Sequence, residues 1–131
     1  DVQVVWRAAD VISSQYNSCV FRDGHVFGIH GREDAGTAHL RCARTDQGTV
    51  SWTQSGFGVA HLILADNGIL ALTSNGELVL LEANAQSYRE LQRFRIFQAT
   101  TRALPALANG RLYVRSNGSD RNTLRVFQVG A

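Results

Sequence analysis

Apolar residues occur along this chain in short runs, and residues that favour turns separate the runs. Short apolar runs bounded by Gly, Asn and Asp predict β-strands. Three of the runs end at an Asp-Gly or Asn-Gly pair, and a second run follows each pair. The pairs are Asp23-Gly24, Asn67-Gly68 and Asn109-Gly110. Both central residues of a type I′ turn need positive φ, so each pair predicts a two-stranded hairpin.

The three hairpins recur at a nearly constant interval. Their glycines stand at 24, 68 and 110, which gives steps of 44 and 42 residues. This interval is typical of the four-stranded blades of a β-propeller. A turn and a third strand follow each hairpin, with turns at 31–37, 74–76 and 116–118 and strands at 39–42, 77–81 and 123–127. The sequence therefore predicts three blade repeats, at roughly 18–54, 60–98 and 103–131.

Fourth strands follow in the first two repeats only. They are predicted at 49–52 and 93–97. The third repeat has no such strand, but residues 1–8 contain Val4-Val5-Trp6, which predicts an outer strand at the start of the chain. We therefore expect an all-β fold of about three four-stranded antiparallel blades, displaced by one strand along the sequence.

One segment also fits a helix. Ser87-Tyr88-Arg89-Glu90 has the capping-box pattern that begins helices, and a short helix could run to Arg95. That helix would change one connection and leave the three repeats intact.

Composition narrows the class of protein. A length of 131 residues fits one domain, and 13 basic against 11 acidic residues give a net charge of only +2. We therefore predict no nucleic-acid partner, and the short apolar runs predict no transmembrane segment. Because Cys19 and Cys42 fall on the first and third strands of one blade, we expect two buried free thiols rather than a disulfide.

Neither a metal site nor a catalytic motif is predicted from the side chains. His25, His30, His39 and His61 lack the spacings of metal-binding motifs. A Gly-x-Ser-x-Gly elbow and a phosphate-binding loop are absent from the sequence as well. We therefore name no catalytic, cofactor-binding or metal-binding residue, and we expect a protein that is not an enzyme.

Arginines gather near the predicted fourth strand of the second blade and the hairpin that follows it. Arginine is enriched at interface hot spots and pairs bidentately with carboxylates. The candidate residues for a partner surface are Arg89, Arg93, Arg95, Arg102 and Arg115. The alternative is a solvated outer face whose charges discourage aggregation.

The order of several motifs resembles the β-propeller repeats of pyrroloquinoline-quinone dehydrogenases and of their non-enzymatic relatives, which include the outer-membrane barrel assembly lipoprotein. The tryptophan-docking motif of that family has an alanine, an aspartate, a Thr-Gly pair and a tryptophan. Gly48 and Trp52 match this motif, whereas Cys42, Arg44 and Gln47 replace the other residues. The resemblance extends over nearly the whole chain.

The docking motif has a physical logic of its own. A glycine permits the tight turn into the outermost strand, and the tryptophan then buries a large apolar area against the next blade. We therefore assign Gly48 and Trp52 to docking between blades, and Trp6 likewise.

Three blades are too few to close a propeller, because propellers have about 4 to 8 blades. Two hypotheses remain open. The chain is a fragment of a larger propeller, which the absence of an initiator Met favours, or two copies form a six-bladed ring in which Val4-Val5-Trp6 of one copy completes the last blade of the other. In both cases we expect exposed apolar surface on the terminal blades of a single chain.

The resemblance implies a non-catalytic binding or scaffold module for protein partners, in a periplasmic or otherwise extracytoplasmic bacterial complex. The alternative is a part of a quinoprotein dehydrogenase, with pyrroloquinoline quinone and Ca²⁺ held by other blades. Binding of a carbohydrate or another ligand at the central channel is a third hypothesis.

Overall fold

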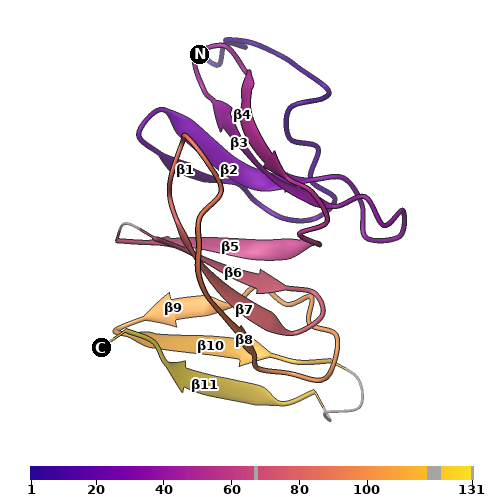
Figure 1. Cartoon of the computed structure of the whole chain (residues 1–131), viewed down its shortest axis with the longest axis vertical. Coiled ribbons are helices and arrows are strands. Elements are labelled where there is room, and N and C mark those ends of the chain that lie inside the picture. Colours follow the sequence, from indigo (N-terminus) through magenta and orange to yellow (C-terminus); the bar gives the residue numbers. More distant parts are fainter. Residues whose placement is uncertain (67, 118–121, 131) are drawn as a thin grey trace.

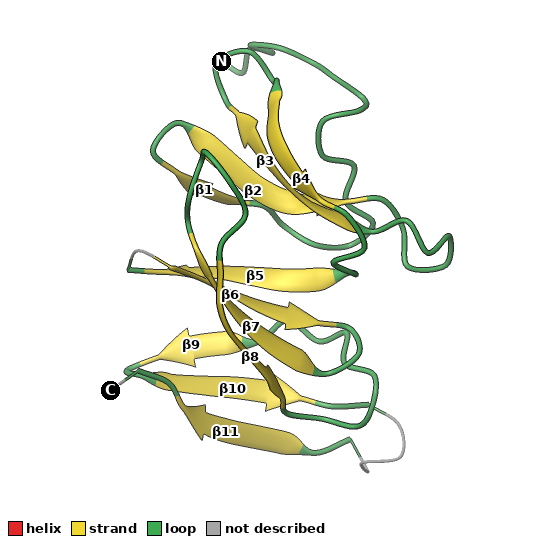
Figure 2. Ribbon diagram, in the orientation of Figure 1, coloured by secondary structure: helices red, strands yellow, loops and turns green. Residues whose placement is uncertain are grey.

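The computed structural model describes residues 1–66, 68–117 and 122–130. All regular structure in these residues is β-strand, without helices, and it forms three antiparallel sheets (Figures 1 and 2). Consistent with this, the described residues contain no helix that could span a membrane. Every sheet is an open meander in which consecutive strands pair, so none of the three closes on itself.

Each sheet lies within one of the predicted repeats. Sheet 1 contains β1 (Val20–Arg22), β2 (His25–His30), β3 (His39–Arg44) and β4 (Val50–Gln54). Sheet 2 contains β5 (Ala60–Ala65), β6 (Gly68–Thr73), β7 (Glu77–Glu82) and β8 (Glu90–Arg95). Sheet 3 contains β9 (Ala106–Ala108), β10 (Arg111–Arg115) and β11 (Leu124–Gln128).

Two of the three predicted hairpin turns are confirmed. Asp23 and Gly24 have φ angles of 47° and 75°, and Asn109 and Gly110 have 51° and 70°, as a type I′ turn requires. The predicted turn at Asn67-Gly68 is wrong in its position, because Gly68 already belongs to β6 and pairs with Ala65. Asn67 itself lies outside the described residues, as does Gly118 of the turn predicted at 116–118.

Sheets 1 and 2 correspond residue by residue. In sheet 1, Phe27 pairs with Cys42, and Cys42 pairs with Trp52. In sheet 2, Leu70 pairs with Leu80, and Leu80 pairs with Gln92. A shift in register directly follows Cys42 in one sheet and Leu80 in the other, so the two ladders share even their irregularity. Gln92 therefore occupies the position in sheet 2 that Trp52 occupies in sheet 1.

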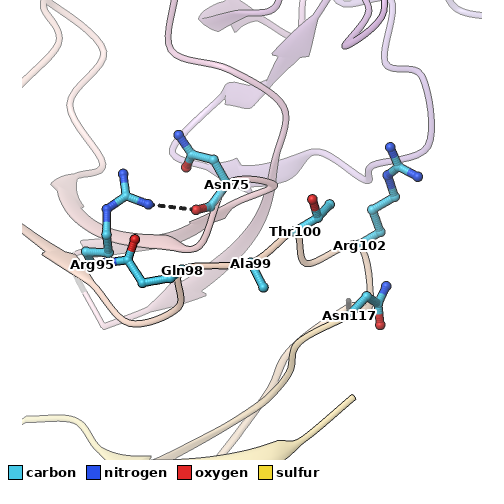
Figure 3. Close-up of a pocket in the computed structure, with 7 residues that line it drawn as sticks. All are labelled: Asn75, Arg95, Gln98, Ala99, Thr100, Arg102 and Asn117. Carbon is cyan, nitrogen blue, oxygen red and sulfur yellow. Dashed lines mark hydrogen bonds between the residues drawn. The ribbon is translucent and has the colours of Figure 1, made fainter. Parts of the chain in front are cut away.

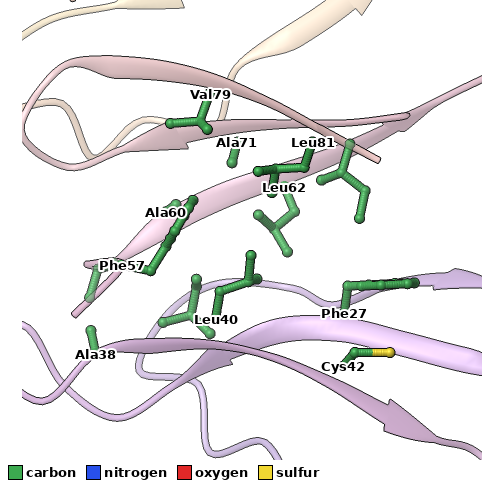
Figure 4. Packing of buried hydrophobic residues seen from close by; sticks show 13 residues of the cluster. Phe27, Ala38, Leu40, Cys42, Phe57, Ala60, Leu62, Ala71, Val79 and Leu81 are labelled. Carbon is green, nitrogen blue, oxygen red and sulfur yellow. The ribbon is translucent and has the colours of Figure 1, made fainter. Parts of the chain in front are cut away.

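The apolar core divides into two clusters. The larger cluster lies between sheets 1 and 2 and includes Phe27, Leu40, Leu62 and Val79 (Figure 4). The smaller cluster lies between sheets 2 and 3 and includes Leu72, Phe97, Leu112 and Val114. The alternating burial along β10 (exposed, buried, intermediate, buried, exposed) shows that one face of sheet 3 packs on sheet 2.

The segment before sheet 1 is not a strand. The prediction of an outer strand within residues 1–8 is wrong for the single chain, because these residues pair with no strand of it and so form no backbone ladder. Residues 6–14 instead lie on sheet 1. Val11 is buried there, the Arg41 guanidinium donates to the carbonyl oxygens of Asp10 and Val11, and Ser14 bridges to Gly31.

The alternative helix after Ser87 does not form, since residues 90–95 are β8. The prediction for the thiols is half right. Both cysteines are free and Cys42 is buried, but Cys19 is exposed. Cys19 precedes β1, the edge strand of sheet 1, so no further strand covers it. Sheet 1 also differs from the expected open terminal blade, because the segment around Val11 covers part of its outer face.

Candidate binding groove

Trp52 fills part of the space between sheets 1 and 2, and a hollow of about 730 Å³ remains there, with Phe27, Ala65 and Asn84 among its lining residues. Its ring centroid lies 6.0 Å from that of Phe27 on β2 and 6.0 Å from that of Tyr88 in the connection between β7 and β8. The indole N–H donates to the Asn84 carbonyl oxygen at 2.8 Å, so its polar atom is satisfied where the ring is partly buried. A residue of sheet 1 is thereby fixed to sheet 2.

Gln92 leaves the corresponding space between sheets 2 and 3 open. A glutamine side chain has no ring to fill it, and a hollow of about 960 Å³ remains there. We call this hollow the groove. Its walls are mainly apolar and come from both sheets; the residues used below are Leu80, Gln92, Phe94, Leu107 and Phe127.

The rim of the groove carries apolar side chains that face solvent. Phe94 is 51% exposed, although it lies on a regular strand. Ala108, on β9, is exposed as well and also lines the groove. Phe127 contributes to the inner wall, and its ring makes an edge-on contact with Phe97 at a centroid distance of 6.3 Å. An apolar cavity with exposed aromatic surface at its mouth suits an apolar or aromatic ligand group.

A smaller hollow, of about 540 Å³, lies at the opposite ends of sheets 2 and 3, beside the connection from β8 to β9 (Figure 3). Its lining is polar and comprises Asn75, Arg95, Gln98, Ala99, Thr100, Arg102 and Asn117. Backbone hydrogen bonds from Thr101 N to Ser74 O and from Asn117 N to Thr100 O, both 2.8 Å, tie the connection to the turns on either side. Figure 3 shows the Arg95 guanidinium donating to the Asn75 carbonyl oxygen, at 2.9 Å.

The structure separates the five arginines of the predicted partner surface. Arg95 and Arg102 line the polar hollow. Arg89 pairs with Glu82 at 3.2 Å, away from that hollow. Arg115 is an exposed residue at the end of β10.

Arg93 belongs to an ion-pair cluster. It contacts Glu77 at 2.6 Å and Glu90 at 2.9 Å, and its guanidinium lies 5.8 Å from the ring centroid of Phe57. The hydrogen bond to Glu90 is the main cause that raises the pKa of Arg93, and the same contact lowers the pKa of Glu90. Arg102 pairs in a similar way with Glu33 at 3.1 Å. These guanidiniums are engaged by carboxylates of their own chain. The partner surface of the five arginines stays a prediction.

Two further pKa shifts report burial near Trp52. Burial raises the pKa of the Cys42 thiol to about 11, so this thiol stays protonated and unreactive at neutral pH. Burial, together with the carboxylate of Glu90, raises the pKa of Tyr88 to about 12. Neither group has the lowered pKa of an activated nucleophile.

Trp6 and Gly48 meet directly. The Trp6 indole N–H donates to the Thr45 carbonyl oxygen, and the indole ring lies over Gly48. Gly48 has a φ of +63°, and a Cβ atom built there would lie 2.8 Å from Trp6 Cε3. The turn that the sequence assigned to Gly48 is present, and the glycine also provides the flat surface on which Trp6 packs.

The histidines serve local structure. His30 and His39 pair across β2 and β3, and each Nδ1 atom accepts a backbone N–H, from Ser13 and Gly56 respectively. His61 is buried, and its Nε2 lies 2.8 Å from the Arg102 carbonyl oxygen. In the described part of the chain, no three His, Cys, Asp or Glu side chains are grouped as metal ligands.

No protein-family model matches the chain, and no curated protein matches it. Among solved structures, the chain is similar to the computationally designed Ika8 protein, with a TM-score of 0.43 and 10% identity over 91% of this chain and 49% of Ika8. It is also similar to the computationally designed Ika4 protein, with a TM-score of 0.39 and 13% identity over 95% of this chain and 100% of Ika4. The chain thus spans about half the length of Ika8.

The groove is the feature that sequence reasoning missed. Its signal was present, because the fourth strand of the first repeat carries Trp52 whereas the second carries Gln92. The equivalence of these two residues depends on the register between the third and fourth strands, which only the structure provides.

Proposed function

We propose that this chain is part of a β-propeller and acts as a non-catalytic module that binds protein partners, with the groove as the binding site. The observation that carries the proposal is the replacement of an indole by an amide at equivalent positions, Trp52 and Gln92. Three consecutive antiparallel meanders of similar size, packed face to face, support the propeller assignment.

The chemistry of the groove selects an aromatic anchor from the partner. The equivalent space between sheets 1 and 2 holds an indole in van der Waals contact with both sheets. The walls of the groove present Leu80, Leu107 and Phe127 in its place. Burying one large apolar side chain contributes roughly 1.5 to 3 kcal/mol, which makes a single aromatic residue an effective hot spot.

The surroundings of the groove have the composition of a protein interface. Phe94 is an exposed apolar residue on β8 that lines the groove. Asp66, Arg95 and Gln128 also line the groove and add charged and polar groups around that residue. An apolar centre with a charged rim is typical of interfaces. The sequence resemblance adds the proposal that the partner belongs to a bacterial extracytoplasmic complex.

The proposal is tested with a labelled short peptide that carries one tryptophan among serine, glycine and glutamate residues, and with the same peptide bearing alanine instead. Fluorescence anisotropy should show that only the tryptophan peptide binds. Gln92→Trp fills the groove and should weaken binding at least tenfold. Gln98→Trp places the same ring in the polar hollow and should leave binding unchanged.

Three outcomes would contradict the proposal. The first is a wild-type protein that does not bind the tryptophan peptide. The second is equal binding by the Gln92→Trp variant and the wild type, which would place the site elsewhere. The third is stoichiometric binding of pyrroloquinoline quinone in the presence of Ca²⁺, seen as a shifted absorbance, which would favour a quinoprotein instead.

A further inference from the structure

In the described part of the chain, an apolar segment at the start belongs to no sheet, and sheet 3 has three strands where sheets 1 and 2 have four. Val2, Val4 and Val5 are 100%, 80% and 87% exposed. At the other end of the molecule, β11 is an edge strand of sheet 3, and Figure 1 shows no segment alongside it. Leu124 and Val126 of this strand are 63% and 53% exposed.

Trp6 docks on sheet 1 in the way that Trp52 docks on sheet 2. Each indole N–H donates to a backbone carbonyl oxygen in the connection between the third and fourth strands of the sheet, Thr45 for Trp6 and Asn84 for Trp52. Trp52 belongs to β4, the fourth strand of the preceding sheet. By this correspondence, residues 2–6 lie where the fourth strand of a sheet before sheet 1 would lie.

The residues that follow each tryptophan support the same correspondence. Phe57 follows Trp52 and is buried against sheet 2, with 8% of its surface exposed. Val11 follows Trp6 and is buried on sheet 1, with 9% exposed. The segment after Trp6 therefore has the character of a connection that arrives from a neighbouring sheet.

The edge of sheet 3 provides a matching register. Tyr113 is the third residue after the hairpin turn of sheet 3, as Phe27 is in sheet 1, so the two positions are equivalent. Tyr113 pairs with Val126 and Phe27 pairs with Cys42, so Val126 corresponds to Cys42. Cys42 pairs with Trp52. A strand added to β11 in this register would place Trp6 opposite Val126 and Ala8 opposite Leu124.

We propose that residues 2–8 of one copy of this chain add as the fourth strand to β11 of a second copy, and that the exchange is reciprocal. Strand addition satisfies the open backbone groups of β11 and covers Leu124 and Val126. Both the donor segment and the acceptor edge belong to the same chain, so a second copy satisfies both at once. The product is a two-fold symmetric ring of six four-stranded sheets.

The faces that would meet in this ring are both apolar in part. Sheet 3 presents Tyr113, Leu124 and Val126 on the face away from sheet 2, since their neighbours on β10 and β11 pack inward. Sheet 1 presents Phe21, which is 59% exposed. The contact between these faces is distinct from the groove between sheets 2 and 3.

Light scattering at several concentrations tests the exchange. The wild-type chain should have a mass of about twice 14.4 kDa. Val126→Lys adds a charge at a position that is exposed in the single chain, so it should fold and be monomeric. Leu91→Lys makes the same kind of change on sheet 2 and should remain dimeric. The monomeric variant should still bind the tryptophan peptide, which separates this test from that of the groove.

Cysteine cross-linking tests the register. In a Cys19→Ser background, Ala8→Cys combined with Leu124→Cys should form a disulfide between copies under mild oxidation, seen as a dimer on a non-reducing gel. The background removes the exposed native thiol. Either single cysteine variant should give a markedly lower yield. A wild-type mass near 14.4 kDa at every concentration, or a dimer that the double variant does not cross-link, would overturn the proposal.

Discussion

The space between sheets 1 and 2 and the space between sheets 2 and 3 share one backbone register, and the largest difference at equivalent positions of that register is Trp52 against Gln92. Trp52 packs against the core of the first, where a hollow of about 730 Å³ remains, whereas Gln92 leaves a hollow of about 960 Å³ in the second. The strands, the pairing and the shift in register are the same in both places. We therefore propose that the residue at this position of the fourth strand decides whether the space between two sheets serves stability or binding.

The larger core reflects this difference. Trp52 reaches Phe27 and Tyr88, so aromatic contacts extend from sheet 1 to the β7–β8 connection. Between sheets 2 and 3, the described aromatic contacts are limited to Phe97 with Phe127 and to the guanidinium of Arg125 over Phe97 at 4.9 Å. We expect the contacts between sheets 2 and 3 to contribute less to the free energy of unfolding than the contacts between sheets 1 and 2.

The largest effect is expected from Trp52→Ala. Removing the indole creates a cavity between sheets 1 and 2 and leaves the Asn84 carbonyl oxygen without its donor, so unfolding free energy should fall by about 3 to 5 kcal/mol in urea melts. Gln92→Ala is the matched control and should cost less than about 1 kcal/mol, since the space beside it is already open. Equal losses in the two variants would refute the difference between the two spaces.

Gly48→Ala should have the next largest effect. Alanine at a φ of +63° costs about 1 to 2 kcal/mol, and its Cβ also collides with the Trp6 ring. Gly36→Ala is the control, because Gly36 has the same φ of +63° and nothing within 4 Å of its added Cβ. The difference in unfolding free energy between the two variants measures the Trp6 contact and should be about 1 kcal/mol or more. If the two variants are equally stable, Trp6 does not dock on Gly48.

Gln92→Trp should raise stability. The added ring buries apolar area against Leu80 and Leu107, and we expect a gain of about 1 kcal/mol in urea melts after the loss of side-chain entropy. Gln98→Trp, in the polar hollow, should give no gain. A destabilised Gln92→Trp variant would show that the groove is too narrow for an indole.

The smallest expected effect is a loss of folding stability at alkaline pH. The folded-state pKa of Tyr88 is raised to about 12, mainly by burial and then by Glu90, from an ordinary value of 10. The protonated form is thus favoured in the fold, and its stabilising contribution is present below pH 10 and is lost as pH rises towards about 12. Absorbance titration should show a late phenolate step that Tyr88→Phe removes, and an unchanged titration in that variant would assign the step to another tyrosine.

Much of the fold follows from local sequence signals. The pairs Asp23-Gly24 and Asn109-Gly110 place two hairpins because their conformational needs are local. The short apolar runs place the strands because their length and boundaries exclude helices of ordinary size. The strand within residues 1–8 was wrong for the single chain, since a strand depends on a partner edge that local sequence does not supply.

Less of the candidate site than of the fold can be predicted from the sequence. The five arginines were grouped by their proximity in the chain, yet Arg93 and Arg102 pair with Glu77 and Glu33, which lie far away in the sequence. The exposure of Cys19 follows from its place beside an edge strand, and the role of Gln92 follows from the register of β7 with β8. Each of these depends on contacts between segments that are distant along the chain.

The most direct test of the account is an NMR measurement of where an indole binds. With methyl-labelled protein and the tryptophan peptide, nuclear Overhauser effects should connect the peptide indole to the methyl groups of Leu80 and Leu107, which wall the groove. Such contacts would show that the space left by Gln92 accepts the group that Trp52 provides in the neighbouring sheet. Contacts to methyl groups elsewhere in the protein, or none at these two leucines under saturating peptide, would contradict it.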